Sequence, residues 1–217
     1  MVRRVAILTI SIVSAASQGQ AQSAKAGATQ DSNIDPKPNW SIHASAATYV
    51  LRDDDDYVQP TVAVDRGKLH LEGRYNYEAQ RSGSGFIGWN LEFGKTVTLQ
   101  LTPMFGAVVG ATDGIIPALE LDFAWRRLEL YSEGEYVIDV NRLSDSFLYN
   151  WSEVSVWPVK WLRAGVVTQR TRAHHVPPDI QRGLLVGAAL RKVEPVFYFF
   201  NPGSDDRFFV ASIGVEF

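Results

Sequence analysis

Apolar and polar residues alternate in short runs along the chain from residue 40 onward. In KLHLEGRYNYE, at residues 68–78, leucines and tyrosines alternate with charged and polar side chains, and residues 84–93, 96–109 and 114–125 repeat this pattern. Successive side chains of a β-strand point to opposite faces, whereas a helix repeats its apolar positions every three or four residues. The pattern therefore predicts an all-β protein whose strands each have one apolar face.

Twelve runs have this character, although two of them are short enough that ten strands are also possible. The short ones are 58–65 and 194–201. Apolar residues occur on both faces of the runs 146–157, 181–191 and 194–201. The alternation therefore does not show which face of these runs points outward and which points inward. The twelve predicted strands are 42–52, 58–65, 68–78, 84–93, 96–109, 114–125, 128–138, 146–157, 160–171, 181–191, 194–201 and 207–217.

The connections between these strands alternate in length. Tight turns such as Gly94-Lys95 and Arg126-Arg127 alternate with longer polar stretches such as RDDDD at 52–56 and RAHHVPPD at 172–179. Short turns at one end and long loops at the other, with an even number of strands, are typical of a transmembrane antiparallel β-barrel. Aromatic side chains are expected in girdles on its lipid-facing side. We place in these girdles Trp40, Trp125, Trp157, Trp161, Tyr75, Tyr77 and the run Phe197–Phe200.

Residues 1–21 have the composition of a secretory signal peptide. Arg3 and Arg4 precede an apolar stretch from Val5 to Val13, and small residues follow up to Ala21. Residues 22–39 are small and polar and contain no aromatic residue, so we predict a flexible N-terminal tail. The predicted barrel domain then covers residues 40–217.

Export and charge exclude some classes of function. The formal net charge of −3 becomes −5 when Arg3 and Arg4 are removed with the signal peptide (−3 − 2 = −5), which disfavours a nucleic-acid partner. The chain has no cysteine, so it contains neither a disulfide nor a catalytic thiol. We find no motif for a cofactor, and neither the pair His174-His175 nor the run Asp53–Asp56 has the further ligands expected of a metal site.

The last predicted strand, RFFVASIGVEF, is apolar or small at every second position and ends in an aromatic residue. The residues that carry this pattern are Phe209, Ile213, Val215 and Phe217. The strand closely resembles the C-terminal signal of bacterial outer-membrane β-barrel proteins. The resemblance implies location in the bacterial outer membrane, contact with its lipid, and recognition of these four residues by the barrel assembly machinery.

If the apolar faces meet lipid, the polar faces line the lumen. Eight acids and two arginines would then face inward, and because two arginines cannot pair with all the carboxylates, we expect a water-filled, acidic lumen. Glu72, Glu120, Glu133 and Glu153 are expected at a common height near the membrane middle. The predicted lumen-facing residues are Glu72, Arg74, Glu92, Glu120, Asp122, Glu129, Glu133, Glu135, Glu153 and Arg163.

These features favour a channel for passive diffusion of small hydrophilic solutes, with no catalytic residue, metal or cofactor. Two alternatives remain open. One is an outer-membrane lipid-hydrolysing enzyme, because His43-x-Ser45 has the spacing of the base and nucleophile in outer-membrane phospholipase A and lipid A deacylase. The other is a structural or adhesive barrel whose lumen is plugged.

Overall fold

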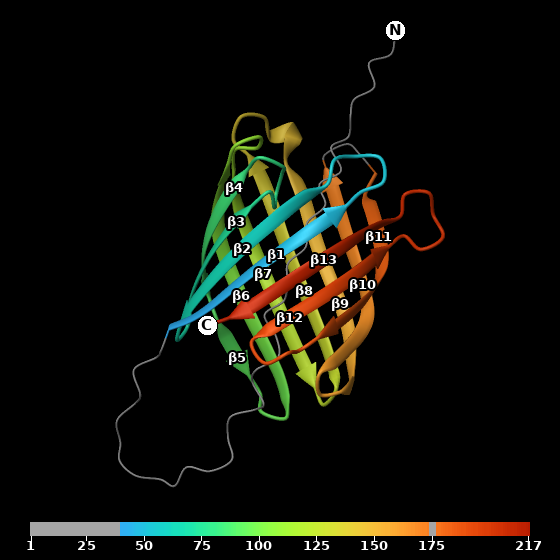
Figure 1. Cartoon of the computed structure of the whole chain (residues 1–217). Coiled ribbons are helices and arrows are strands. Elements are labelled where there is room, and N and C mark those ends of the chain that lie inside the picture. Colours follow the sequence, from blue (N-terminus) through green and yellow to red (C-terminus); the bar gives the residue numbers. More distant parts are fainter. Residues whose placement is uncertain (1–39, 174–176) are drawn as a thin grey trace.

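The computed structural model describes residues 40–173 and 177–217, which form one closed antiparallel β-barrel (Figure 1). The predicted signal peptide (1–21), the predicted tail (22–39) and His174-His175 lie outside the described residues. The strands are β1 (Trp40–Val50), β2 (Tyr57–Arg66), β3 (Leu69–Tyr75), β4 (Gly83–Trp89), β5 (Leu91–Phe93), β6 (Val97–Val109), β7 (Gly114–Trp125), β8 (Leu128–Asp139), β9 (Phe147–Val159), β10 (Leu162–Ala173), β11 (Asp179–Ala188), β12 (Val193–Phe200) and β13 (Phe208–Glu216).

The thirteen strand segments occupy twelve positions in the barrel. β4 and β5 are separated only by Asn90, and both pair with β6 on the same side. The backbone N–H of Asn90 donates to the carbonyl of Lys68, 2.7 Å away, and the register with β6 is the same before and after this residue. The prediction of a twelve-stranded all-β protein is therefore confirmed.

The first and last strands close the barrel. β1 pairs with β2 on one side and with β13 on the other, from His43 opposite Glu216 to Val50 opposite Phe209. The N–H of Phe217 extends this ladder by donating to the carbonyl of Ile42 at 2.9 Å. Closure satisfies the backbone groups that an open edge would leave unpaired, and such groups cost several kcal/mol each in lipid.

Short and long connections lie at opposite ends of the barrel (Figure 1). The five turns β2–β3, β5–β6, β7–β8, β9–β10 and β11–β12 have two to four residues, and the six connections at the other end have four to seven. One long connection contains the 3-10 helix η1 (Leu143–Asp145). Among the described residues, no helix is long and apolar enough to cross a membrane.

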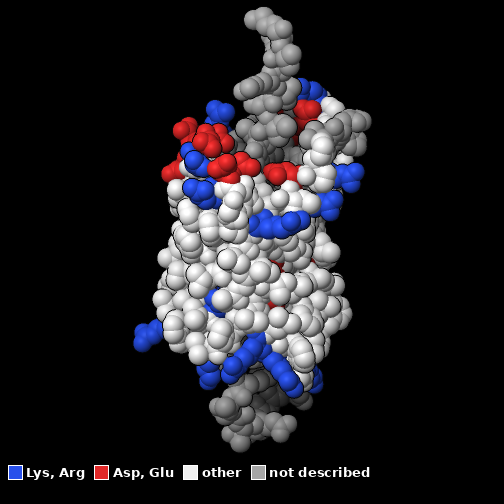
Figure 2. Space-filling view, turned by 90° about the vertical axis from the view of Figure 1, so that its right-hand side faces the viewer, with Lys and Arg blue, Asp and Glu red and all other residues white. Residues whose placement is uncertain are grey.

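The outer surface of the barrel is apolar between its two ends. Figure 2 shows few charged atoms in the middle of one side and many at both ends. Four tryptophans, Trp40, Trp89, Trp125 and Trp161, are 43 to 55% exposed near the short turns. The guanidinium of Arg126 lies 5.3 Å from the ring centroid of Trp125. Tryptophan with basic residues beside it is typical of a membrane interface.

The connection after β3 differs from the prediction. The strand ends at Tyr75 rather than at residue 78, because Asn76 adopts a left-handed conformation (φ 56°), which asparagine tolerates better than most residues. Its N–H donates to the carbonyl of Ser82 at 2.9 Å, and its side chain accepts from the N–H of Arg81 at 2.7 Å. Residues 76–82 thus form a tight loop that turns Tyr77 into the barrel interior.

Candidate functional site

The structure places most of the predicted lumen residues in the barrel interior. Seven are buried, namely Glu72, Arg74, Asp122, Glu133, Glu135, Glu153 and Arg163. Glu120 and Glu129 are partly exposed. Glu92, opposite Gln100 near the short turns, is exposed and lies apart from the others. The expectation that water contacts these carboxylates is wrong for Glu133 and Glu135, which are 0% and 1% exposed.

Arg74 is the centre of a cluster that reaches from β3 to β8. Its Nη1 lies 2.6 Å from Glu133 Oε1 and 3.3 Å from Glu135 Oε2. Its Nε donates to Glu72, and its Nη2 lies 3.8 Å from Glu120 Oε1. β3 and β8 are not neighbours, since β4/β5, β6 and β7 lie between them. The guanidinium therefore links side chains across the lumen, and its five donors explain how one arginine contacts four carboxylates.

Tyrosines complete the Arg74 cluster. The Tyr77 hydroxyl donates to Glu133 Oε2 at 2.6 Å, and the Tyr131 hydroxyl lies 3.1 Å from the same oxygen. The Arg74 guanidinium also stacks on two rings, 4.1 Å from the centroid of Tyr77 and 4.4 Å from that of Phe86. These contacts offset part of the cost of burying the carboxylates.

A second ionic cluster surrounds Arg163 on the opposite side of the barrel. Its Nη1 lies 3.3 Å from Glu153 Oε2 and its Nε lies 3.2 Å from Glu194 Oε1. Tyr198 and Trp151 donate to Glu153 Oε1 at 2.8 and 2.9 Å. Glu194 was not predicted to face the lumen, because its strand is apolar on both faces and gives no clear alternation. Glu153 belongs to this cluster rather than to that of Glu72, Glu120 and Glu133.

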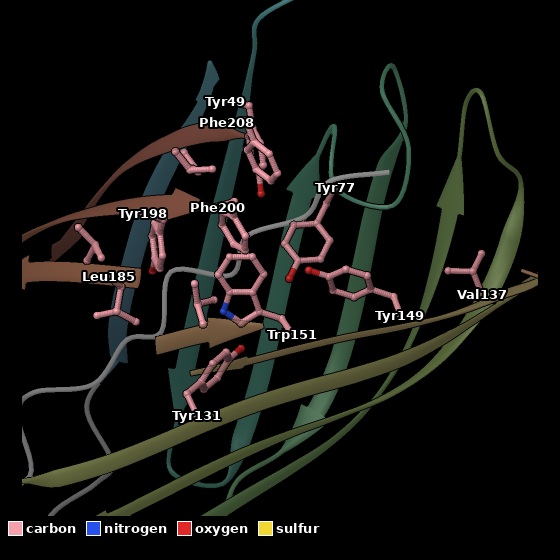
Figure 3. Close-up of a cluster of buried hydrophobic side chains, with 14 of the residues drawn as sticks. Tyr49, Tyr77, Tyr131, Val137, Tyr149, Trp151, Leu185, Tyr198, Phe200 and Phe208 are labelled. Carbon is pink, nitrogen blue, oxygen red and sulfur yellow. The ribbon is translucent and has the colours of Figure 1, made fainter. Parts of the chain in front are cut away.

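Aromatic side chains fill the interior toward the long loops (Figure 3). We call the following residues the aromatic layer, and each is at most 6% exposed: Tyr49, Tyr77, Tyr149, Trp151, Tyr198, Phe200 and Phe208. Trp151 meets Tyr198 edge to face at 5.5 Å between ring centroids, and Tyr77 meets Tyr149 at 6.5 Å. Phe200 stacks on Phe208 at 4.7 Å. The rings come from β1, β9, β12, β13 and the loop 76–82, so they meet across the lumen.

The aromatic layer corrects the predicted outer girdle. Tyr77, Tyr198 and Phe200 are fully buried, although the sequence placed them on the lipid side. Tyr75 and Phe197 are 49% and 44% exposed, as the sequence predicts. The direction of Tyr77 follows from the turn at Asn76. The inward face of β12 is aromatic instead of polar, which the alternation of apolar and polar residues could not reveal.

The residues of the alternative hypotheses lie near the short turns. His43 and Ser45 are on β1, where Ser45 pairs with Gly214 and the ring of His43 lies against that glycine. We assign neither residue a catalytic role.

The residues of the predicted C-terminal signal lie on or next to β13. Phe209 and Ile213 are 38% and 49% exposed on the outer face, and Phe217 is 67% exposed. Val215, opposite Ala44, is partly exposed.

The two clusters together hold more acidic than basic side chains. Two arginines contact six carboxylates: those of Glu72, Glu120, Glu133, Glu135, Glu153 and Glu194. Carboxylates in a narrow space of low dielectric attract cations and repel anions. The ionic clusters and the aromatic layer thus bring acidic groups and aromatic rings together in the barrel interior.

No family model matches the chain, and no curated protein matches it. Several solved structures share its fold. The KdgM porin has 11% sequence identity and a TM-score of 0.56, over 82% of this chain and 99% of that chain. The KdgM porin in complex with disordered oligogalacturonate has 10% sequence identity and a TM-score of 0.58, over 82% of this chain and 99% of that chain. The NanC porin has 10% sequence identity and a TM-score of 0.53, over 81% of this chain and 98% of that chain. The prediction of a transmembrane antiparallel barrel is thereby confirmed at the level of the fold, which is that of these small porins.

Proposed function

We propose that the protein is a channel of the bacterial outer membrane that passes small hydrophilic solutes through a constricted, acidic lumen. The observation that carries the proposal is a closed barrel with an apolar outer face and charged residues inside it. Ionic groups in the barrel interior cost several kcal/mol each to dehydrate, and a path for hydrophilic solutes is the role that we propose for them. The shared fold with the KdgM and NanC porins supports the same function.

The charge of the constriction suggests the class of solute. One matched structure holds an oligogalacturonate, which is a polymer of sugar acids. The six carboxylates around Arg74 and Arg163 would repel such a polyanion. We therefore propose that this channel prefers cations and neutral hydrophilic solutes over anions.

We predict that the refolded barrel conducts ions across a planar bilayer with a modest preference for cations. Under a tenfold KCl gradient, the reversal potential should have the sign of cation selectivity and should move toward zero as total salt is raised, because salt screens the carboxylates. Glu120 is partly exposed, so Glu120→Gln should reduce the selectivity, whereas Glu92→Gln, away from the constriction, serves as the matched control. An anion-selective potential would refute the proposed role of the acidic cluster.

The aromatic layer also favours a second candidate, a structural barrel whose lumen is closed. Side chains from β9, β12 and the loop 76–82 meet in the interior. The same bilayer experiment separates the candidates, since a closed barrel would insert normally, show no conductance and leave loaded liposomes unswollen.

We also propose that residues 1–21 direct export and that the assembly machinery recognises Phe209, Ile213, Val215 and Phe217. The support is the position of these four residues on or next to β13, the strand that pairs with β1 and closes the barrel. Recognition would require side chains that are accessible, and Phe209, Ile213 and Phe217 are exposed.

Replacing Phe217 with serine is expected to lower the yield of membrane-inserted protein in cells several-fold, while refolding of the purified chain into detergent stays normal. Phe93→Ser is the control, because Phe93 is 52% exposed near the same end and its replacement removes a similar apolar area. Insertion is measured as the heat-modifiable fraction in outer-membrane preparations. Equal losses for the two variants, or a loss in refolding as well, would indicate a general effect on stability instead of recognition.

A further inference from the structure

Three side chains in the Arg74 cluster have the chemistry and placement of metal ligands. One ligand atom from each of His70, Glu72 and Glu120 lies within 4.8 Å of the others. His70 and Glu72 are on β3 and are 6% and 8% exposed, and Glu120 comes from β7 with its side chain 13% exposed. Because β4/β5 and β6 separate β3 from β7, the three groups meet in the lumen and not along one edge of neighbouring strands.

The orientation of His70 is fixed by a chain of hydrogen bonds. Its Nδ1 lies 2.9 Å from Asp65 Oδ1, and because an ionised carboxylate can only accept, Nδ1 donates. The Asn90 side chain donates to the same oxygen at 2.6 Å, and Thr102 donates to Asn90 at 2.8 Å. By the same argument Nε2 donates to Glu72 Oε2, 3.2 Å away, so a metal ion bound here would take the place of the proton on Nε2. A carboxylate behind a histidine is the usual partner of a metal-binding imidazole.

The two carboxylates are also held in place. Glu72 accepts from Arg74 through its other oxygen, Oε1, which leaves Oε2 toward His70. Glu120 Oε1 lies 3.2 Å from the Tyr131 hydroxyl. Each of the three groups therefore has a partner outside the trio that fixes its position, as in sites where outer-shell groups orient the ligands of a metal.

The electrostatic balance of the region favours a bound cation. Asp65, Glu72, Glu120, Glu133 and Glu135 lie around Arg74 and His70. Oε1 of Glu135, which is 1% exposed, has no hydrogen-bond partner among the residues that the structure describes. A divalent ion that replaces the proton on His70 Nε2 would add one positive charge in a place where the carboxylates are poorly solvated.

We propose that His70, Glu72 and Glu120 bind a first-row divalent metal ion such as Zn²⁺ inside the lumen. One imidazole nitrogen and two carboxylate oxygens suit zinc and its neighbours, whereas Ca²⁺ and Mg²⁺ prefer oxygen ligands alone. Three protein ligands leave a coordination position for water or for a solute in the lumen. The inference goes beyond the proposed channel and does not depend on it, because the site would exist in an open or a closed barrel.

The test is a titration of the tag-free, refolded barrel with Zn²⁺, followed by calorimetry, and with Co²⁺, followed by its visible absorption. One ion per chain is expected to bind. His70→Gln and Glu120→Gln should each weaken binding by at least about tenfold, and Asp65→Asn, which removes only the carboxylate behind the histidine, by about tenfold. Binding of Zn²⁺ should also raise the unfolding temperature of the wild type more than that of these variants, by mass action.

The adjacent histidines His174-His175 provide the control, because they are the one pair of neighbouring imidazoles in the sequence and lie outside the proposed trio. The double variant His174→Ala/His175→Ala should retain the site with unchanged affinity. Loss of binding in this double variant, together with full binding in His70→Gln, would overturn the proposal, as would the absence of saturable Zn²⁺ binding in the wild type. Heat-modifiability on gels shows which variants are folded, and Asp65→Asn tests the site if His70→Gln does not fold.

Discussion

Replacing Arg74 with methionine should lower the free energy of unfolding by about 3–5 kcal/mol, the usual cost of removing one partner from a buried ion pair. The Arg74 side chain is 0% exposed and contacts Glu133 at 2.6 Å and Glu135 at 3.3 Å. Methionine fills a similar volume but leaves these carboxylates without a cation. Urea denaturation of the refolded barrel in detergent micelles measures the change, with tryptophan fluorescence as the signal.

Two further variants separate charge from packing at this position. Arg74→Met/Glu133→Gln removes one of the stranded carboxylates and should recover part of the lost stability. Arg126→Met, at an exposed rim position over Trp125, should cost less than about 1 kcal/mol, because exposed charges contribute little. If Arg74→Met is no more destabilised than Arg126→Met, the Arg74 cluster does not hold β3 and β8 together.

Alternation predicts the fold well because one side of a transmembrane barrel faces lipid and the other faces polar groups. Glu72, Glu120 and Glu133 were expected at one height, and they do meet around Arg74. Glu153 lies in another cluster because height along a strand says nothing about position around the barrel. Its partner Arg163 is on β10, the next strand to β9, which holds Glu153.

The sequence did not predict which side chains point inward where apolar and polar residues do not alternate. Both faces of β9 and β12 are apolar, so Trp151 inside and Val154 outside look alike in the sequence. The inward turn of residues 76–82 depends on the left-handed backbone of Asn76 and on hydrogen bonds to Val58 and Ser82. Alternation of apolar and polar residues along one strand carries no information about such tertiary contacts.

In the channel that we propose, two kinds of side chain would act differently on a solute. There the carboxylates around Arg74 and Arg163 would set the sign of the charge that can pass, and the aromatic layer would set the width. Tyr77 belongs to both, since its hydroxyl donates to Glu133 and its ring contacts Arg74 and Tyr149. Tyr77 is thus the residue whose removal should change the width most directly.

Replacing Tyr77 with alanine is expected to raise the single-channel conductance by about twofold or more, because it removes a ring that spans part of the lumen. Tyr77→Phe keeps the ring and loses only the 2.6 Å hydrogen bond to Glu133, so its conductance should stay near the wild-type value. Tyr75→Ala is the matched control, because Tyr75 lies two residues away but is 49% exposed on the outer face. A wild-type barrel that is silent while Tyr77→Ala conducts would also place the constriction at Tyr77. Equal conductance of Tyr77→Ala, Tyr75→Ala and the wild type would show instead that solutes pass elsewhere, and that the loop 76–82 does not limit the pore.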